Sequence, residues 1–182
     1  MIDAERLITF AGKTPVVAPT AFIAPGSRII GDVEIGNESS IWYNCVLRGD
    51  VNRIRIGART NIQDGTVIHV DSPRGGDEGL PTIIGDDVLI GHMVMLHGSL
   101  LHDRAFVGLG SIVMDGCVIE SDGMLAAGAM LTPGKVIGAG ELWIGRPAKK
   151  LRDMSAQEIA GNRAGAAHYV QLAQAHKAAL SG

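Results

Sequence analysis

The 182-residue sequence predicts an all-β solenoid of hexapeptide repeats that ends in a C-terminal α-helix. Three observations predict this fold: an aliphatic residue returns every six positions, a small or β-branched residue follows most of them by four positions, and glycine is frequent. A period of six does not fit an amphipathic helix of period 3.6, and it extends too far for one alternating strand. Short strands that turn at regular corners satisfy it, so we expect parallel coils of about 18 residues each.

The aliphatic repeat runs from position 17 to position 143 in four registers. Nineteen of its twenty positions are Ile, Leu or Val, and the set is Val17, Ile23, Ile29, Ile35, Ile41, Leu47, Ile56, Ile62, Ile68, Ile84, Ile90, Leu96, Leu101, Val107, Val113, Ile119, Leu125, Leu131, Ile137 and Trp143. The 25 glycines, about twice the usual share, indicate many corners, and only seven aromatic residues leave a narrow core of branched aliphatics.

The sequence predicts one hexapeptide-repeat domain over residues 1–148 and a helical segment over residues 149–182. The stretch Gly145–Lys149 breaks the strand pattern, and Ser155 with Glu158 three positions later forms a capping-box pattern. Apolar and small residues then recur every three or four positions, as they do along one face of a helix. We expect this helix to pack on the β-helix.

Charge and composition exclude some classes of function. A net charge of -3 and a pI near 6.0 give no electrostatic reason to bind nucleic acid. Residues 1–10 resemble neither a signal peptide nor a membrane span, so we expect a cytoplasmic protein without a membrane partner. Cys45 and Cys117 lie more than three coils apart at inward positions, which predicts two core residues rather than a disulfide.

Three slips interrupt the repeat. Nine residues separate Leu47 from Ile56, sixteen separate Ile68 from Ile84, and five separate Leu96 from Leu101. The sixteen-residue gap contains a ten-residue insertion within residues 71–81, whose Gly, Pro and charged residues predict an external loop. Loops that leave a regular solenoid often border functional surfaces.

Removing the insertions places polar side chains in two columns. His69 and His97 are 28 residues apart, or 18 without the insertion, so they stack one coil apart on one face. Arg48 falls on the same face one coil below His69. Asp64 falls on the neighbouring face, with His92 one coil above it.

Two imidazoles about 4.8 Å apart on stacked strands can share one metal ion, because zinc takes nitrogen ligands at about 2.0 to 2.1 Å. His92 lies five residues from His97, roughly 15 Å of extended chain, so the third ligand is expected from a neighbouring subunit. Three solenoids around a threefold axis would bring the two columns together. Arg48 of one chain would then pair with Asp64 of the next. His102, His168 and His176 are expected to be ordinary surface or hydrogen-bonded histidines.

Several motifs together resemble the gamma-class carbonic anhydrase family. The matching residues are Arg48-Gly49-Asp50, Asn61-x-Gln63-Asp64, His69 and Gly91-His92-x4-His97. The resemblance implies a left-handed β-helix, a handedness that the spacing alone does not set. It also implies a homotrimer in which His69 and His97 of one chain and His92 of another bind zinc, or iron or cobalt. Arg48, Asp50 and Asp64 would support assembly.

The resemblance implies hydration of carbon dioxide to bicarbonate by a zinc-dependent lyase. Three neutral histidines leave an open position for water, whose pKa the metal lowers from 15.7 toward about 7. Gln63 would help to place the resulting hydroxide, with Asn61 in the same motif. The best studied members carry a glutamate where this chain has Val51, so Asp77, Glu78, Tyr169 or buffer would have to move the proton.

Other classes of function remain open. Hexapeptide solenoids also include acyltransferases that use one histidine as a general base on coenzyme A thioesters, and Gly145–Lys149 resembles their closing segment. A thioesterase on the same metal, or a metal-binding homologue with little activity, is a further alternative. The number of convergent histidines distinguishes them, because a base needs one and a metal needs three.

Overall fold

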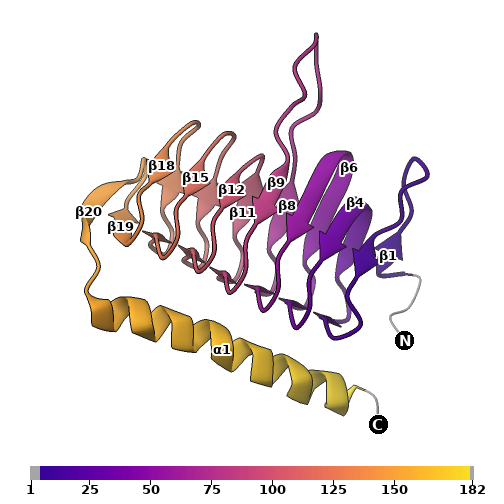
Figure 1. The fold of residues 1–182 in the computed structure, drawn as a ribbon. Helices are drawn as coiled ribbons and strands as arrows, with labels where there is room; N and C mark the ends of the chain where they lie inside the picture. The colour runs from indigo at the N-terminus through magenta and orange to yellow at the C-terminus, as the bar shows by residue number, and fades with distance from the viewer. Residues whose placement is uncertain (1–4, 181–182) are drawn as a thin grey trace.

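The computed structural model describes residues 5–180 and shows a solenoid of short parallel strands with one long helix alongside (Figure 1). The strands stack in three columns, one for each face. The first face holds β1 (Leu7–Ile8), β8 (Val67–His69), β11 (Met95–His97), β14 (Ile112–Val113), β17 (Met130–Leu131) and the first halves of β4 (Arg28–Ile35) and β6 (Val46–Ile56). The second holds β2 (Val16–Val17), β9 (Thr82–Ile84), β12 (Leu100–Leu101), β15 (Val118–Ile119), β18 (Val136–Ile137) and the second halves of β4 and β6. The third holds β3 (Phe22–Ile23), β5 (Ser40–Ile41), β7 (Asn61–Ile62), β10 (Leu89–Ile90), β13 (Phe106–Val107), β16 (Met124–Leu125) and β19 (Glu141–Ile144).

The predicted aliphatic repeat forms the core. Of its twenty positions, all are buried except Val17 and Trp143, which are partly buried and pack against the others. Successive repeat residues are paired across parallel strands, as Ile62 is with Ile90. Cys45 and Cys117 are free and buried, as expected for inward positions. The narrow interior therefore holds one aliphatic side chain per face and coil.

Two of the predicted slips lie side by side. The extra residues after Leu47 extend β6 into an 11-residue strand that turns a corner, and the ten-residue insertion projects from the solenoid between β8 and β9 (Figure 1). The amide of Asn52 donates to the carbonyl oxygens of Asp71 (3.1 Å) and Glu78 (3.0 Å). The base of the loop is closed by the Asp71 N–H, which donates to the Leu80 carbonyl at 2.9 Å. The loop is thus attached to the turn of β6.

The C-terminal segment begins with a strand that the repeat pattern did not predict. β20 (Lys149–Asp153) pairs antiparallel with β19 and covers the end of the third face. Residues 149–153 are therefore extended, and the helical part of the predicted segment is α1 (Ala156–Ala179). The predicted capping box is confirmed, since the Ser155 hydroxyl accepts from the Glu158 N–H and the Glu158 carboxylate accepts from the Ser155 N–H.

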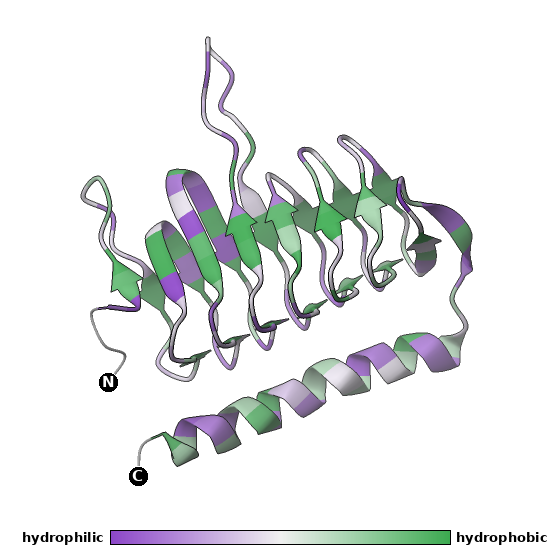
Figure 2. Ribbon diagram, turned by 180° about the vertical axis from the view of Figure 1, so that it is seen from behind, coloured by the Kyte–Doolittle hydropathy of each residue, from purple (hydrophilic) through white to green (hydrophobic). Residues whose placement is uncertain are grey.

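Helix α1 runs along the solenoid and contacts strands of the third face, as predicted. Small residues such as Ala166 and Ala173 are its buried positions, and polar and apolar residues alternate along it, whereas the strands are mostly apolar (Figure 2). An aromatic cluster fills the contact: Phe22, Trp42, Tyr43, Tyr169 and His176. Over residues 5–180, no helix is both long and apolar enough to cross a bilayer.

The neighbouring residues Val136 and Ile137 give a direct test of the core. Ile137 is fully buried, whereas Val136 on the same strand is 49% exposed. We expect Ile137→Ala to lower the free energy of unfolding by about 2–5 kcal/mol, because it leaves a cavity. Val136→Ala should change it by about 0.5 kcal/mol or less. Equal losses in urea unfolding would contradict the inward assignment.

Glu141 should contribute to acid stability. Its carboxylate accepts hydrogen bonds from Lys150 (2.7 Å), Trp143 (2.8 Å) and the Gly138 N–H (2.9 Å), which together lower its pKa to about 2. A depressed carboxyl pKa stabilises the fold above the unfolded value near 4.5 and loses that contribution as the pH falls toward about 2. In Glu141→Gln, stability should therefore fall less between pH 4.5 and 2 than in the parent, as measured by melting temperature. Parallel acid profiles would contradict this.

Candidate metal centre

His69 and His97 stack on the first face of the solenoid. Each follows an inward aliphatic residue, Ile68 or Leu96, and strand alternation therefore turns each imidazole outward. The two histidines are paired in register, which confirms the predicted stacking. Nδ1 of His69 lies 3.1 Å from Nε2 of His97.

A carboxylate binds the other nitrogen of each ring. Nε2 of His69 lies 3.0 Å from Oδ1 of Asp50, and Nδ1 of His97 makes a short hydrogen bond to Oδ1 of Asp115. Burial alone would raise the pKa of Asp50, but hydrogen bonds from His69 and Arg48 outweigh it and lower that pKa below its usual range. Because a carboxylate only accepts hydrogen bonds, each ring commits its N–H to its aspartate.

This arrangement fits a bound cation. When both rings are neutral and donate to Asp50 and Asp115, their remaining nitrogens direct lone pairs at each other across 3.1 Å. Such a pair repels unless a proton or a metal ion lies between the two nitrogens. A tetrahedral zinc ion with Zn–N distances of about 2.0 to 2.1 Å separates two ligand nitrogens by about 3.3 Å, close to the observed spacing. His69 and His97 are therefore suited to hold one metal ion together.

His92 lies in the second column, after β10 on the third face. Its Nδ1 lies 2.9 Å from Oδ2 of Asp64, and both side chains are substantially exposed. The hydrogen bond to Asp64 leaves Nε2 as the nitrogen with a free lone pair. Within residues 5–180, no three His, Cys, Asp or Glu side chains come close enough together to hold a metal ion. Among the described residues, His92 therefore does not join His69 and His97 within one chain.

Arg48 and Asp64 have partners in their own chain. Arg48 lies opposite His69 by register, and its Nη1 contacts Oδ2 of Asp50 at 2.6 Å. Asp64 accepts from the backbone N–H of Tyr43 at 3.2 Å, in addition to contacting His92. Sequence reasoning did not predict these contacts.

Asn61 and Gln63 are buried beside β7, and Nε2 of Gln63 donates to Oδ1 of Asn61 at 3.1 Å. Tyr169 of α1 packs edge-on against Trp42, with ring centroids 5.6 Å apart. Burial raises the pKa of Tyr169, and the nearby negative charge of Asp64 raises it further. These three predicted catalytic residues are thus on the side of the Asp64–His92 column.

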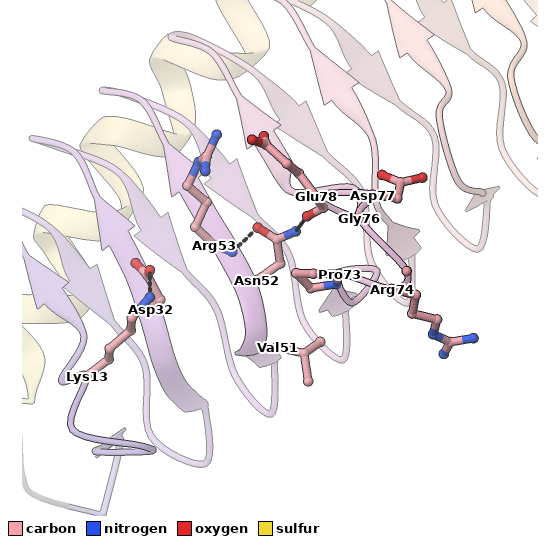
Figure 3. A pocket seen from close by; sticks show the side chains of 11 residues that line it. Lys13, Asp32, Val51, Asn52, Arg53, Pro73, Arg74, Gly76, Asp77 and Glu78 are labelled. Atoms are coloured by element: carbon pink, nitrogen blue, oxygen red, sulfur yellow. Dashed lines mark hydrogen bonds and ion pairs between the residues drawn. The ribbon is translucent and has the colours of Figure 1, made fainter.

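Val51 lies in the wall of a cavity between the turn of β6 and the external loop (Figure 3). Asp77 and Glu78 line the same cavity, together with Lys13, Asp32, Asn52, Arg53, Pro73, Arg74, Gly75 and Gly76. None of the three candidate ligand histidines is among these lining residues. The candidates for proton transfer are therefore split between this cavity and Tyr169 on the helix.

Of the residues that contact the histidine pair, Asp115 is the one that sequence analysis did not name. Leu96 pairs with Val113 on the next coil, so Met114 lies opposite His97 and Asp115 lies opposite Gly98, one residue further along the turn. Extending the column by one more coil gives Met114, so counting alone does not identify Asp115.

Comparison with known proteins identifies relatives over most of the chain. No family model matches it. The chain is 48% identical to gamma carbonic anhydrase 1, mitochondrial, of Arabidopsis thaliana, covering 96% of this chain and 63% of that protein. The chain thus spans somewhat less than two thirds of this plant relative. It is also 42% identical to a carbonic anhydrase of Geobacillus kaustophilus, covering 93% of this chain and 90% of that protein.

Two solved structures share the fold closely. A hexapeptide transferase family protein from Anaplasma phagocytophilum superposes with a TM-score of 0.88 at 51% identity, covering 95% of this chain and 99% of that one. A putative acetyltransferase from Bacillus cereus gives 0.90 at 39% identity, covering 95% and 97%. The solenoid is accordingly a left-handed parallel β-helix of hexapeptide repeats. With relatives above 40% identity matched over nearly the whole chain, the protein belongs to the gamma carbonic anhydrase family.

Proposed function

We propose that this protein is a metal-dependent carbonic anhydrase of the gamma class that interconverts carbon dioxide and bicarbonate. The observation that carries the proposal is the pair formed by His69 and His97, whose free nitrogens face each other at 3.1 Å while aspartates hold the other two. The names of the Arabidopsis and Geobacillus relatives support the same activity.

The metal is proposed to be zinc, with iron or cobalt as alternatives, because neutral imidazoles suit all three ions. His69 and His97 would come from one chain and His92 from its neighbour in a homotrimer. The exposed position of His92 supports this, since its Nδ1 is held by Asp64 while its Nε2 is free. Arg48 is also substantially exposed, which leaves it available to Asp64 of the adjacent chain.

When bound by three neutral histidines, the metal supplies Lewis acidity that lowers the pKa of water toward about 7. The residues of the chain would do the rest. Asp50 fixes the ring of His69, and Arg48 in turn holds Asp50. Gln63 and Asn61 form a buried amide pair that would orient the attacking oxygen from the neighbouring face.

Few ionisable side chains are placed to accept the proton that the reaction releases. Val51 carries no ionisable group, and Asp77 and Glu78 line the same cavity as Val51. Tyr169 keeps its proton at neutral pH because its pKa is raised, so it would act as a hydrogen-bond donor rather than as a base. We therefore propose that Asp77, Glu78 or buffer accepts the proton, and that turnover is slow at low buffer concentration.

A coenzyme A-dependent acyltransferase is the second candidate, because the two structural neighbours at 51% and 39% identity are described as transferases. A thioesterase, or a metal-binding relative with little activity, is also consistent with the fold. An acyltransferase needs one histidine base. Here two imidazoles face each other, and an aspartate binds the outer nitrogen of each. Acyl transfer from acetyl coenzyme A, unaffected by removal of the metal, would favour this candidate.

The cytoplasm remains the proposed location. Two free, buried cysteines suit a reducing compartment. Burial raises the pKa of the Cys45 thiol to about 12, which keeps it unreactive.

His97→Ala should abolish metal binding, because it removes one of two ligands that a single chain supplies. Metal analysis should give about one ion per chain for the parent and almost none for the variant. Stopped-flow hydration of carbon dioxide should fall by about 100-fold or more. His102→Ala, which removes a half-buried histidine after β12, is the matched control and should retain both. A variant at position 97 that binds metal like the parent would refute the ligand assignment.

Arg48→Met should weaken the trimer by about 2–5 kcal/mol of association free energy, because Asp64 of the adjacent chain loses its guanidinium partner across the interface. Arg53→Met, on the same strand, is the control. Sedimentation over a range of concentrations should show dissociation only for the first variant, with unchanged circular dichroism. A trimer of undiminished stability would rule out the intersubunit ion pair.

A further inference from the structure

We propose that Asp115 is a positioning residue that sets the metal affinity of the centre by fixing the ring of His97, and that Gly98 and Leu80 create the space and the cover for this contact. The inference rests on the proposed function, since it assigns a role toward the same metal. Asp115 itself contacts neither substrate nor metal in this proposal.

The contact follows from the stacking of the coils. Leu96 pairs with Val113 on the next coil, so Asp115 lies opposite Gly98, and its Oδ1 hydrogen-bonds Nδ1 of His97. The N–H of Gly116 donates to the carbonyl of Gly98 at 2.8 Å, which ties the two turns together. Because the carboxylate only accepts, it selects the form of His97 that carries its proton on Nδ1. Nε2 is then unprotonated and directed at His69.

Asp115 differs from Asp50 and Asp64, the aspartates that bind His69 and His92, in having a single side-chain partner. Asp50 also binds Arg48, and Asp64 also accepts from the Tyr43 backbone. Over residues 5–180, the carboxylate of Asp115 has a hydrogen bond or ion pair only with His97. Its side chain is also 43% exposed, so it contributes little to the core. A change at this position should therefore affect the histidine and leave the solenoid intact.

Gly98 is required for the approach of Asp115. Its φ of 47° lies in the left-handed region, and a methyl group at this position would lie 2.7 Å from Oδ1 of Asp115 and 2.9 Å from Cβ of Leu80. Any larger residue would therefore push the carboxylate away from His97 or displace Leu80.

Leu80 connects the external loop to the same contact. It lies against Gly98 and also close to Gly116, where an added methyl group would lie 3.9 Å from its Cδ1. These two glycines directly follow His97 and Asp115 in the chain. The end of the loop thus packs over both turns that hold the hydrogen-bonded pair.

Removing a carboxylate that orients a ligating histidine typically weakens metal binding by about 10- to 100-fold, because the ring must then be ordered by the metal alone. Asp115→Ala should show a loss in this range. Asp115→Asn keeps an acceptor oxygen and should lose less. Asp103→Ala is the matched control, since Asp103 is also a turn aspartate that accepts one hydrogen bond, from the Asp86 N–H at 2.9 Å. Its metal affinity should equal that of the parent.

The experiment measures zinc affinity of the full chain by competition with a chromophoric chelator, and the melting temperature of the metal-free protein. A positioning role predicts that Asp115→Ala loses affinity while its metal-free melting temperature falls no more than that of Asp103→Ala. Equal zinc affinity in parent and Asp115→Ala overturns the inference and leaves the proposed function in place. A parent that binds no zinc, iron or cobalt overturns both.

Gly98→Ala gives an independent test with its own control. Gly128 has a similar positive φ of 67°, but a methyl group added there meets nothing within 4 Å. Both substitutions strain the backbone, and only the first displaces Asp115. We expect Gly98→Ala to weaken zinc binding by about 10-fold or more, and Gly128→Ala to leave it unchanged. Equal effects of the two variants would overturn the role of Gly98.

Discussion

The vertical register of the coils is the constraint on which the rest of the structure depends. Parallel strands about 4.8 Å apart bring residues 18 positions apart into contact, wherever no insertion intervenes. The buried aliphatic repeat fixes this register, because a one-residue slip would turn every inward side chain outward. His69 and His97 are therefore held at a separation suited to a shared ion by a core that contains no part of the site.

The polar groups on the first face form a sequence of dependent contacts. Arg48 holds Asp50, Asp50 holds His69, and Asp115 holds His97 from the coil above. In each of these three contacts the donor is known, because a guanidinium only donates hydrogen bonds and a carboxylate only accepts them. The fourth contact joins Nδ1 of His69 to Nε2 of His97, and when both rings are neutral neither of these nitrogens carries a proton to donate. The positive charge that it lacks is what a metal ion would supply.

Sequence reasoning located the columns but not the side-chain contacts within them. The repeat set the face and level of His69, His92 and His97, because those follow from counting. It did not predict that Arg48 binds Asp50, or that Asp64 binds His92 in the same chain, because such pairing depends on rotamers and on neighbouring turns. The strand β20 also escaped prediction, since residues 149–153 are exposed and carry no hexapeptide pattern.

The slips in the repeat lie beside the strands that carry His69 and His97, and not within them. The histidines lie on coils in register, whereas the insertion begins directly after His69 and returns through Leu80 to the turn beside His97. Asn52, which belongs to the other slip, holds this loop at its base through two hydrogen bonds. An insertion within β8 or β11 would disturb the stacking that aligns His69 with His97. Here the slips leave the pairing of His69 with His97 intact and add polar loop residues beside it, as is typical of loops carried by a rigid scaffold.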